Sequence, residues 1–170
     1  MLSDADAAAA RRIAAAFPFE RGVTSIHVRH GDKGIEMVLV DDRKYFDAAE
    51  ALVVNNPLAY GRVAFISTED PGTIAAAERE ARGWAFLWFN VPRINSNGLD
   101  QIARLAVPRG TLTHIWFLQL LMALECDAWV GTRGSNWNRL IDELRCVWVP
   151  KCANEYVEVG DPHDYEHYGW

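Results

Sequence analysis

The chain lacks any apolar run long enough to cross a lipid bilayer. The longest such run, residues 115–124, is about half of the roughly 20 residues that a membrane-spanning helix needs. The chain also lacks an excess of positive charge, because its formal net charge is −6. Nucleic-acid binders present a basic surface to the phosphate backbone, so this acidic balance argues against that class. The first 16 residues are rich in alanine and lack the apolar centre of a secretory signal, so we expect a soluble protein.

Cysteine is scarce, with three residues at positions 126, 146 and 152. Their spacing fits no zinc-binding pattern, and their odd number decides neither pairing nor redox compartment. Cys126 and Cys146 fall in apolar segments, so we expect buried, unreactive thiols. Lysine is scarce too, with 3 residues against 14 arginines. A guanidinium can grip phosphate or carboxylate at two points, which hints at anion binding, although GC-rich coding also favours arginine.

The residues that are abundant indicate a folded α/β domain. Half of the chain is hydrophobic and 11% is aromatic, which excludes full disorder. The length suits one domain or one lobe of a two-lobed protein. Apolar strands are expected at 23–29, 62–67, 84–89, 127–131 and 146–149. Helices are expected at 5–16, 41–54, 70–82, 111–125 and 135–144.

This alternation predicts a Rossmann-like parallel sheet with helices on both faces. Residues 1–22 are interpreted as a helical extension, and residues 23–170 as the sheet domain. Residues 92–108 are expected to be irregular or to hold a short helix, and residues 161–170 to form an irregular aromatic tail. Ligands of such sheets bind beyond the carboxyl ends of the strands, so the segments that follow the strands are the candidate sites.

The first of these segments reads HVRHGDKG. Alternation along a strand puts His27 and Arg29 on one face and Val28 and His30 on the other. Arg29, placed before a glycine turn, can aim its guanidinium at a phosphate, although an ordinary solvated strand end has the same pattern. A metal site made by His27, His30 and Asp32 is disfavoured because these side chains diverge.

Three further segments carry polar groups in suitable places. A turn of small residues follows the fourth expected strand, and Ser135 or Asn136 can cap the next helix, whose free N–H groups suit a phosphate. A plain capped junction explains the same residues. Glu69 and Asp70 follow the second strand and can hold ribose hydroxyls, hold an arginine, or simply favour a helix N-terminus. Gln119 is the polar residue of a long apolar helix and can face a ligand pocket.

Taken together and in order, these segments resemble the nucleotide-sugar-binding half of the α1,6-fucosyltransferases and their relatives, the bacterial NodZ-type and protein O-fucosyltransferase-like enzymes. The family's H-V-R-R-x-D-K is similar to H-V-R-H-G-D-K at 27–33, and Glu36 and Tyr45 keep the family's spacing of a glutamate and a tyrosine. The family's T-D-D-P, S-S-Q-x-x-R and D-D-I-Y-Y-F-G resemble 67–71, 134–139 and, loosely, 161–169. The resemblance spans roughly residues 23–169.

The resemblance implies a single nucleotide-sugar-binding lobe of a GT-B-type glycosyltransferase. The implied donor is GDP-fucose or a related GDP-sugar, transferred with inversion to a glycan or protein hydroxyl, with no metal or cofactor. Arg29 would neutralise the β-phosphate of the leaving GDP. Glu36 would take the proton from the acceptor hydroxyl, with Lys33 close enough to tune it.

Further roles follow from the same resemblance. His27 would touch the nucleotide, and Gln119 stands where the family has an acid that recognises guanine. Phosphate would be held at the helix start by Gly134, Ser135 and Asn136. The loop or the acceptor would be supported by Asp32, Tyr45 and Asp70.

The family has another lobe before its first motif, whereas only 22 residues precede that motif here. The chain is then truncated, or completed by another chain that carries the acceptor site, or no longer catalytic. A non-catalytic module that binds a nucleotide sugar or a partner is therefore the alternative, and a purely structural α/β domain is a third reading. The compartment is the Golgi or secretory lumen if the chain is part of a larger eukaryotic transferase, and the cytoplasm otherwise.

Overall fold

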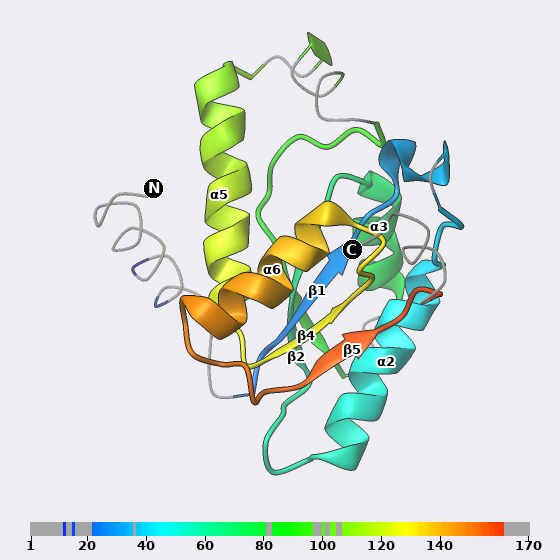
Figure 1. The fold of residues 1–170 in the computed structure, drawn as a ribbon. Coiled ribbons are helices and arrows are strands. Elements are labelled where there is room, and N and C mark those ends of the chain that lie inside the picture. Colours follow the sequence, from blue (N-terminus) through cyan, green and yellow to red (C-terminus); the bar gives the residue numbers. More distant parts are fainter. Residues whose placement is uncertain are drawn as a thin grey trace.

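The computed structural model contains a five-stranded parallel sheet in the order β3-β2-β1-β4-β5 (Figure 1). It describes residues 12, 15, 22–35, 37–80, 83–96, 100, 103–104 and 107–161. The strands are β1 (Thr24–Val28), β2 (Val63–Thr68), β3 (Ala85–Leu87), β4 (Ala128–Gly131) and β5 (Tyr156–Glu158). The fold class predicted from the sequence, an α/β domain with a parallel sheet, is confirmed.

Among the described residues, the helices whose bounds are given are four α-helices and one short 3₁₀-helix. They are η1 (Gly31–Ile35), α2 (Asp42–Asn55), α3 (Pro71–Arg79), α5 (Arg109–Glu125) and α6 (Asn136–Val147). Aspartates cap two of them, since Asp41 accepts a hydrogen bond from the Arg43 amide and Asp70 from the Gly72 amide. Pro71 occupies the first turn of α3, where its missing N–H leaves no bond unmade.

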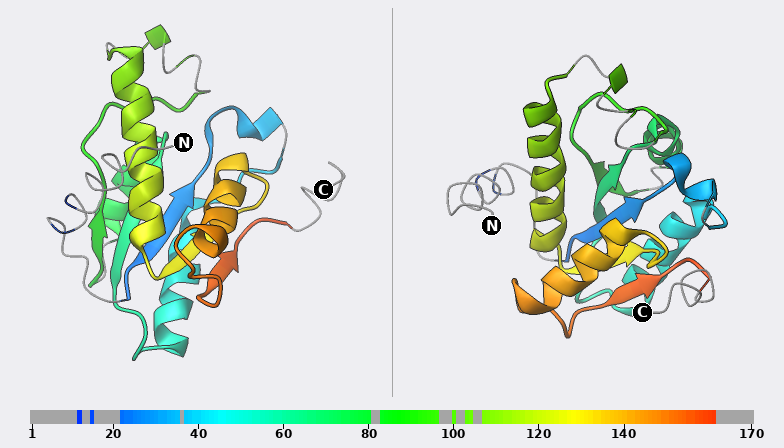
Figure 2. Two further views of the ribbon diagram at one scale, coloured as in Figure 1. Left: turned by 60° about the vertical axis from the view of Figure 1, so that its left-hand side comes forward. Right: turned by 45° about the horizontal axis from the view of Figure 1, so that its top comes forward.

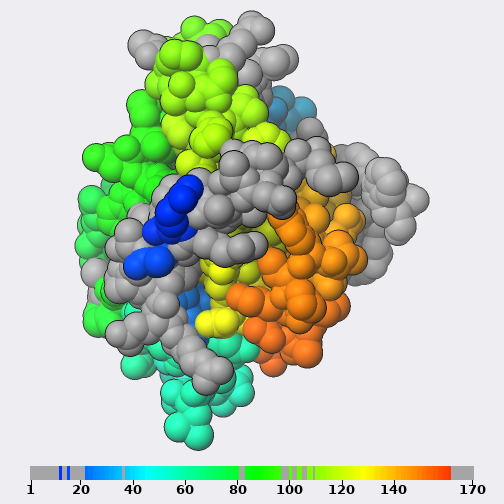
Figure 3. Space-filling model, turned by 90° about the vertical axis from the view of Figure 1, so that its left-hand side faces the viewer, coloured from blue at the N-terminus to red at the C-terminus, as the bar shows by residue number. Residues whose placement is uncertain are grey.

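The helices lie in two layers, one on each face of the sheet (Figure 2). Side chains alternate along each strand, so Ile26 and Val28 pack with Phe46 of α2 on one face. On the other face Phe65 of β2 packs against Met122 of α5. Trp129, Leu124 and Ile141 join β4, α5 and α6 in one cluster on that same face. Figure 3 shows this second face, with α5 in its upper part and α6 below and to the right.

The structure corrects the predicted fifth strand at 146–149. α6 continues to Val147, and the edge strand β5 lies further on, at Tyr156–Glu158. A short apolar run fits a helix end as well as a strand, and the buried positions Asn138, Ile141 and Arg145 follow the helical spacing. The third strand is also shorter than the predicted range 84–89, since β3 is an edge strand of three residues with Ala85 exposed.

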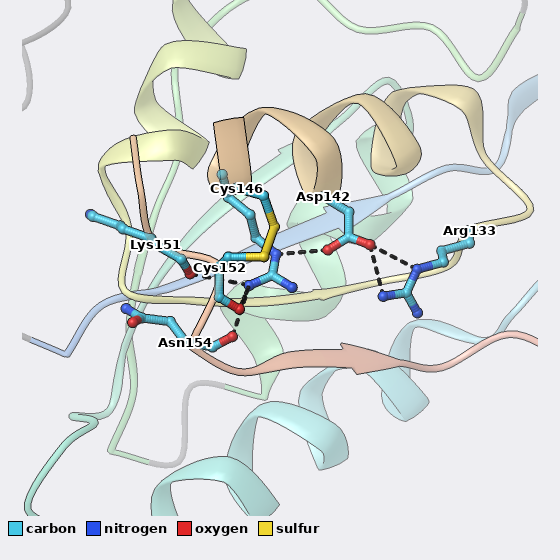
Figure 4. The surroundings of a disulfide bond; sticks show 7 residues. Arg133, Asp142, Cys146, Lys151, Cys152 and Asn154 are labelled. Atoms are coloured by element: carbon cyan, nitrogen blue, oxygen red, sulfur yellow. Dashed lines mark hydrogen bonds and ion pairs between the residues drawn. A yellow bond between two sulfur atoms is a disulfide. The ribbon is translucent and has the colours of Figure 1, made fainter. Parts of the chain in front are cut away.

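The structure corrects one expectation about cysteine as well. Cys146 is not a free thiol but forms a disulfide with Cys152, which ties the end of α6 to the segment before β5 (Figure 4). Cys126 is a buried free thiol, as expected, and burial raises its pKa well above the usual value.

Parts of the sequence-based predictions fall outside the described residues. These are most of the expected N-terminal helix and of the extension over 1–22, and the tail after Asp161. The division of the chain at residue 22 therefore stays a prediction. In the part of the chain that the structure describes, no helix has the length and apolar character to span a membrane.

Candidate functional site

A cavity of about 290 Å³ lies at the carboxyl ends of β1 and β2, under α5 and the first turn of α6. The strand order reverses direction between β1 and β4, and such a switch point is where open α/β sheets bind ligands. The polar wall of the cavity consists of His27, Arg29, Thr68, Glu69, Arg93 and Gln119. Trp116 of α5 and Trp137 of α6 contribute aromatic surface to the same cavity.

Arg29 is held by carboxylates from two directions. Its Nη1 donates to Glu69 Oε1 at 2.6 Å, and its Nη2 donates to Asp32 Oδ1. Glu69 is fixed in turn by the His30 amide, which donates to Oε1 at 2.8 Å. One guanidinium against two carboxylates leaves this cluster with a net charge of −1. Gly31 packs against it with φ +48°, and a β-carbon there would collide with the Arg29 guanidinium.

His27 brings a neutral ring to the cavity wall. Its Nδ1 is hydrogen-bonded to Ser67 Oγ at 2.8 Å, while Nε2 is buried with no hydrogen-bond partner among the described residues. The side chain is only 7% exposed. Burial, reinforced by the positive charge of Arg29, lowers the pKa of His27 to about 3. The unpaired nitrogen is therefore a polar group that a ligand in the cavity could satisfy.

Arg93 lines the cavity but was not among the site residues predicted from the sequence. It lies in the loop after β3 and donates three hydrogen bonds to backbone carbonyls. These run from Nε to Thr68, from Nη1 to Val91 and from Nη2 to Phe89, at 3.1, 3.0 and 2.7 Å. The rule that ligands bind after strand ends, applied to the third strand as well, would have drawn attention to this loop.

His30 points to the other face of the sheet, as alternation predicts, where it connects the loops after β1 and β2 through hydrogen bonds. Its Nδ1 lies 2.8 Å from Asp70 Oδ2 and its Nε2 lies 2.9 Å from the Val40 carbonyl oxygen. Burial alone would lower its pKa, but hydrogen bonds to Asp70 and Val40, with the charges of Asp42 and Asp70, outweigh burial and raise it. Asp70 Oδ2 also accepts from Asn95 Nδ2 at 3.1 Å, and Asn95 Oδ1 accepts from the Gly31 amide at 2.7 Å.

The start of α6 reaches the cavity through Trp137, whose ring centroid lies 6.5 Å from that of His27. The residues predicted to hold phosphate there do not line the cavity, namely Gly134, Ser135 and Asn136. Ser135 is the N-cap but makes no side-chain capping bond. Asn138, in the first turn of α6, donates from Nδ2 to the His27 carbonyl at 3.3 Å and ties the helix to β1. Sequence reasoning missed Asn138 because its partner is 111 residues away.

The remaining predicted site residues are spread over the domain. Gln119 is buried in the cavity wall, as the long apolar helix suggested. Lys33 is buried within η1. Tyr45 is fully buried in the α2 core on the opposite face, where burial raises its pKa. Glu36 lies outside the described residues, so its role as a base stays a prediction. No group of three metal-binding side chains occurs among the residues that are described.

Comparisons with known proteins support the fold. No protein-family model matches the chain, and no curated protein matches it. The crystal structure of POFUT1 in complex with GDP matches with a TM-score of 0.57 at 9% identity, over 94% of this chain and 48% of that chain. POFUT1 in complex with GDP-fucose matches with a TM-score of 0.54 at 10% identity, over 94% and 47% of the two chains. The chain spans about half of POFUT1 and has the α/β fold of that half.

Proposed function

We propose that the cavity binds the donor of a glycosyl transfer, GDP-fucose or a related GDP-sugar, and that the chain is the donor-binding lobe of a fucosyltransferase-like enzyme. One observation carries this proposal. The cavity at the strand ends collects two guanidinium groups, a neutral histidine and two tryptophan rings, within the half of the fold shared with a protein crystallised with GDP-fucose.

The chemistry of such a transfer suits these residues. The acceptor oxygen attacks the anomeric carbon as its proton moves to a base, and the bond from that carbon to the β-phosphate oxygen breaks with inversion. Negative charge then grows on the departing diphosphate, and a fixed guanidinium stabilises that charge without reorganising. Arg29, held in place by Glu69 and Asp32, is the proposed group for this step.

The other roles are assigned by position in the cavity or by the resemblance. Gln119 and the unpaired His27 nitrogen face the nucleotide. Gly134, Ser135 and Asn136, just before and at the start of α6, are assigned to the phosphates by the resemblance alone. Glu36 is the proposed base, with Lys33 beside it. The framework that supports the loop consists of Asp32, Tyr45 and Asp70.

A non-catalytic module that binds a nucleotide sugar is the second candidate. One observation favours it, namely that the Arg29 guanidinium already pairs with Glu69 and Asp32, so that less of its charge is available to stabilise a departing diphosphate. A transfer assay with a broad set of glycan and peptide acceptors, combined with a donor-hydrolysis assay, separates the two candidates. Turnover that disappears in Glu36→Gln supports the enzyme, whereas GDP-sugar binding without any turnover supports the module.

Calorimetry with GDP and GDP-fucose tests the binding proposal. We expect both to bind the wild type, and Arg29→Ala to weaken binding by tenfold or more, because the variant loses a guanidinium and leaves Glu69 and Asp32 unpaired. Arg43→Ala is the matched control, since Arg43 lies exposed on α2 and pairs only with Asp47 in the described structure. Absence of binding at millimolar nucleotide would overturn the proposal.

A further inference from the structure

Arg93 differs in its partners from Arg29, which lines the same cavity, and from Arg145 of α6. Arg29 pairs with Glu69 and Asp32, and Arg145 pairs with Asp142. Arg93 makes no ion pair among the described residues, and its three hydrogen bonds go to neutral carbonyl groups. A half-buried guanidinium without a carboxylate partner costs free energy, and burial lowers its pKa accordingly.

The three carbonyls fix the guanidinium and leave part of it open. A guanidinium has five N–H donors, so about two remain for another partner. The loop that carries Arg93 is itself anchored, because Asn95 bonds to Asp70 and to the Gly31 amide. Thr68, whose carbonyl holds Arg93, precedes Glu69, which holds Arg29. The two guanidinium groups are thus fixed to consecutive residues at the end of β2, and both line the cavity.

The charge of the cavity wall indicates the charge of the ligand that the cavity would bind. Among the described lining residues, Arg29 and Arg93 oppose Glu69 alone, so the wall carries a net charge of +1. Asp32 does not line the cavity, but it pairs with Arg29, and counting it brings the total charge to zero. The positive charge in the wall that has no carboxylate partner is therefore that of Arg93. Independently of charge, the buried Nε2 of His27 lacks a partner in the same cavity. Both observations indicate a polar, anionic ligand.

We propose that Arg93, which lies outside every motif of the family resemblance, is the group that binds the anionic part of the ligand through a phosphate oxygen of a diphosphate. Arg29 assists Arg93 in binding the diphosphate. It does not bind the anion alone, because Glu69 and Asp32 already balance its charge. The inference rests on the proposed function only for the identity of the ligand as a GDP-sugar. The anion site itself is testable with inorganic pyrophosphate.

The experiment compares pyrophosphate, GDP and guanosine by calorimetry on the full chain. We expect Arg93→Gln to weaken pyrophosphate and GDP binding by tenfold or more and to leave guanosine binding unchanged, because only the charged interaction is lost. Arg93→Lys, which keeps the charge, should retain more of the affinity than Arg93→Gln. Arg43→Gln, the exposed control, should bind like the wild type.

A measurement on the wild type guards against a variant that fails to fold. Phenylglyoxal modifies accessible guanidinium groups, and mass spectrometry of the peptides locates the modified residues. Saturating pyrophosphate should slow modification of Arg93 several-fold and leave Arg43 unaffected. Equal modification of Arg93 with and without bound pyrophosphate would overturn the proposal.

The outcomes separate this inference from the proposed function. If GDP binds and Arg93→Gln binds it equally well, the role of Arg93 is wrong and the nucleotide-sugar site stands. If pyrophosphate binding depends on Arg93 but GDP binds no more tightly than pyrophosphate, the anion site stands and the GDP-sugar assignment is wrong. If the wild type binds neither ligand at millimolar concentration, both are wrong.

Discussion

Two arginine-rich regions of this domain use the same side chain in opposite ways. The first is the α6 corner, formed by Arg133, Asp142, Arg145, Asn154 and the Cys146–Cys152 disulfide (Figure 4). There Asp142 accepts from both arginines, at 2.9 Å from Arg133 Nε and 2.7 Å from Arg145 Nε. Arg145 Nη1 also donates to three backbone carbonyls, of which that of Asn154 is the nearest at 2.8 Å.

The second region is the cavity at the ends of β1 and β2. It also holds two guanidinium groups, but Arg93 has no carboxylate partner among the described residues, and the buried His27 Nε2 has no hydrogen-bond partner. In the α6 corner, by contrast, Arg145 pairs with Asp142 and three backbone carbonyls, and the disulfide links the adjoining segments. The aromatic rings of Trp129 and Tyr156 cover Arg145. The difference indicates that the corner stabilises the fold, whereas the cavity contains polar groups that a ligand can still bind.

The largest expected effect is on the free energy of unfolding, when the ion pair between Arg145 and Asp142 in the α6 corner is removed. Arg145→Met removes a buried guanidinium, which is 8% exposed, and leaves one Asp142 oxygen and three carbonyls without their donor. We expect the free energy of unfolding in urea to fall by about 3–5 kcal/mol. Arg43→Met, which breaks an exposed pair with Asp47, should change it by at most about 0.5 kcal/mol. A loss below about 1 kcal/mol in Arg145→Met would contradict the structural role of the corner.

The next effect comes from the covalent part of the corner. The disulfide joins cysteines six residues apart, and a closed loop of this length contributes about 2 kcal/mol by restricting the unfolded chain. We expect the double variant Cys146→Ser, Cys152→Ser to lose about that much in urea unfolding, and dithiothreitol to have the same effect on the wild type. GDP affinity should stay unchanged, because the corner lies outside the cavity. Equal stability of the reduced and oxidised wild type would speak against this contribution.

The sequence was sufficient for the parts of the fold that depend on local patterns. Alternating apolar strands and capped helices predicted the parallel sheet, and strand alternation predicted that His27 and Arg29 share a face, which their common cavity confirms. The apolar run at 146–149 misled the interpretation because its residues suit a helix end equally well. Pairing of Cys146 with Cys152 could not be derived, because spacing alone fits both a disulfide and free thiols.

The parts of the site that the sequence did not reveal depend on contacts between distant residues. The bond of Arg29 to Glu69 joins residues 40 positions apart, and that of Gly31 to Asn95 joins residues 64 apart. The sequence left open that Glu69 holds an arginine, but no local pattern identifies Arg29 as that arginine. Arg93 escaped notice for a related reason, since its loop has no periodicity and its partners are backbone carbonyls.

A glycine variant tests whether the cavity is held in its arrangement by backbone packing. Gly31→Ala requires an L-residue at φ +48° and collides with the Arg29 guanidinium. We expect a loss of about 1–2 kcal/mol in stability and weaker GDP binding by calorimetry. Gly83→Ala is the matched control, because Gly83 has φ +85° but no atom within 4 Å of the added carbon. That variant should have a comparable loss of stability and bind GDP normally; equal binding by both variants would rule out the packing role of Gly31.

The smallest expected effect is the pH dependence of stability, which has opposite sign for the two histidines at the end of β1. The pKa of His30 is raised above 6.5 in the folded protein, so the stability it contributes is present at low pH and is lost as pH rises through the folded value. The difference in unfolding free energy between the wild type and His30→Gln, measured from about pH 5.5 to 9, should therefore shrink as pH rises. His27 has the opposite sign, because its pKa is lowered to about 3 and its contribution is lost as pH falls from 6.5 towards that value. A His30→Gln difference that is independent of pH would mean that the Asp70 and Val40 contacts do not hold the ring in its protonated form, and a neutral ring would then donate to only one of these two oxygens.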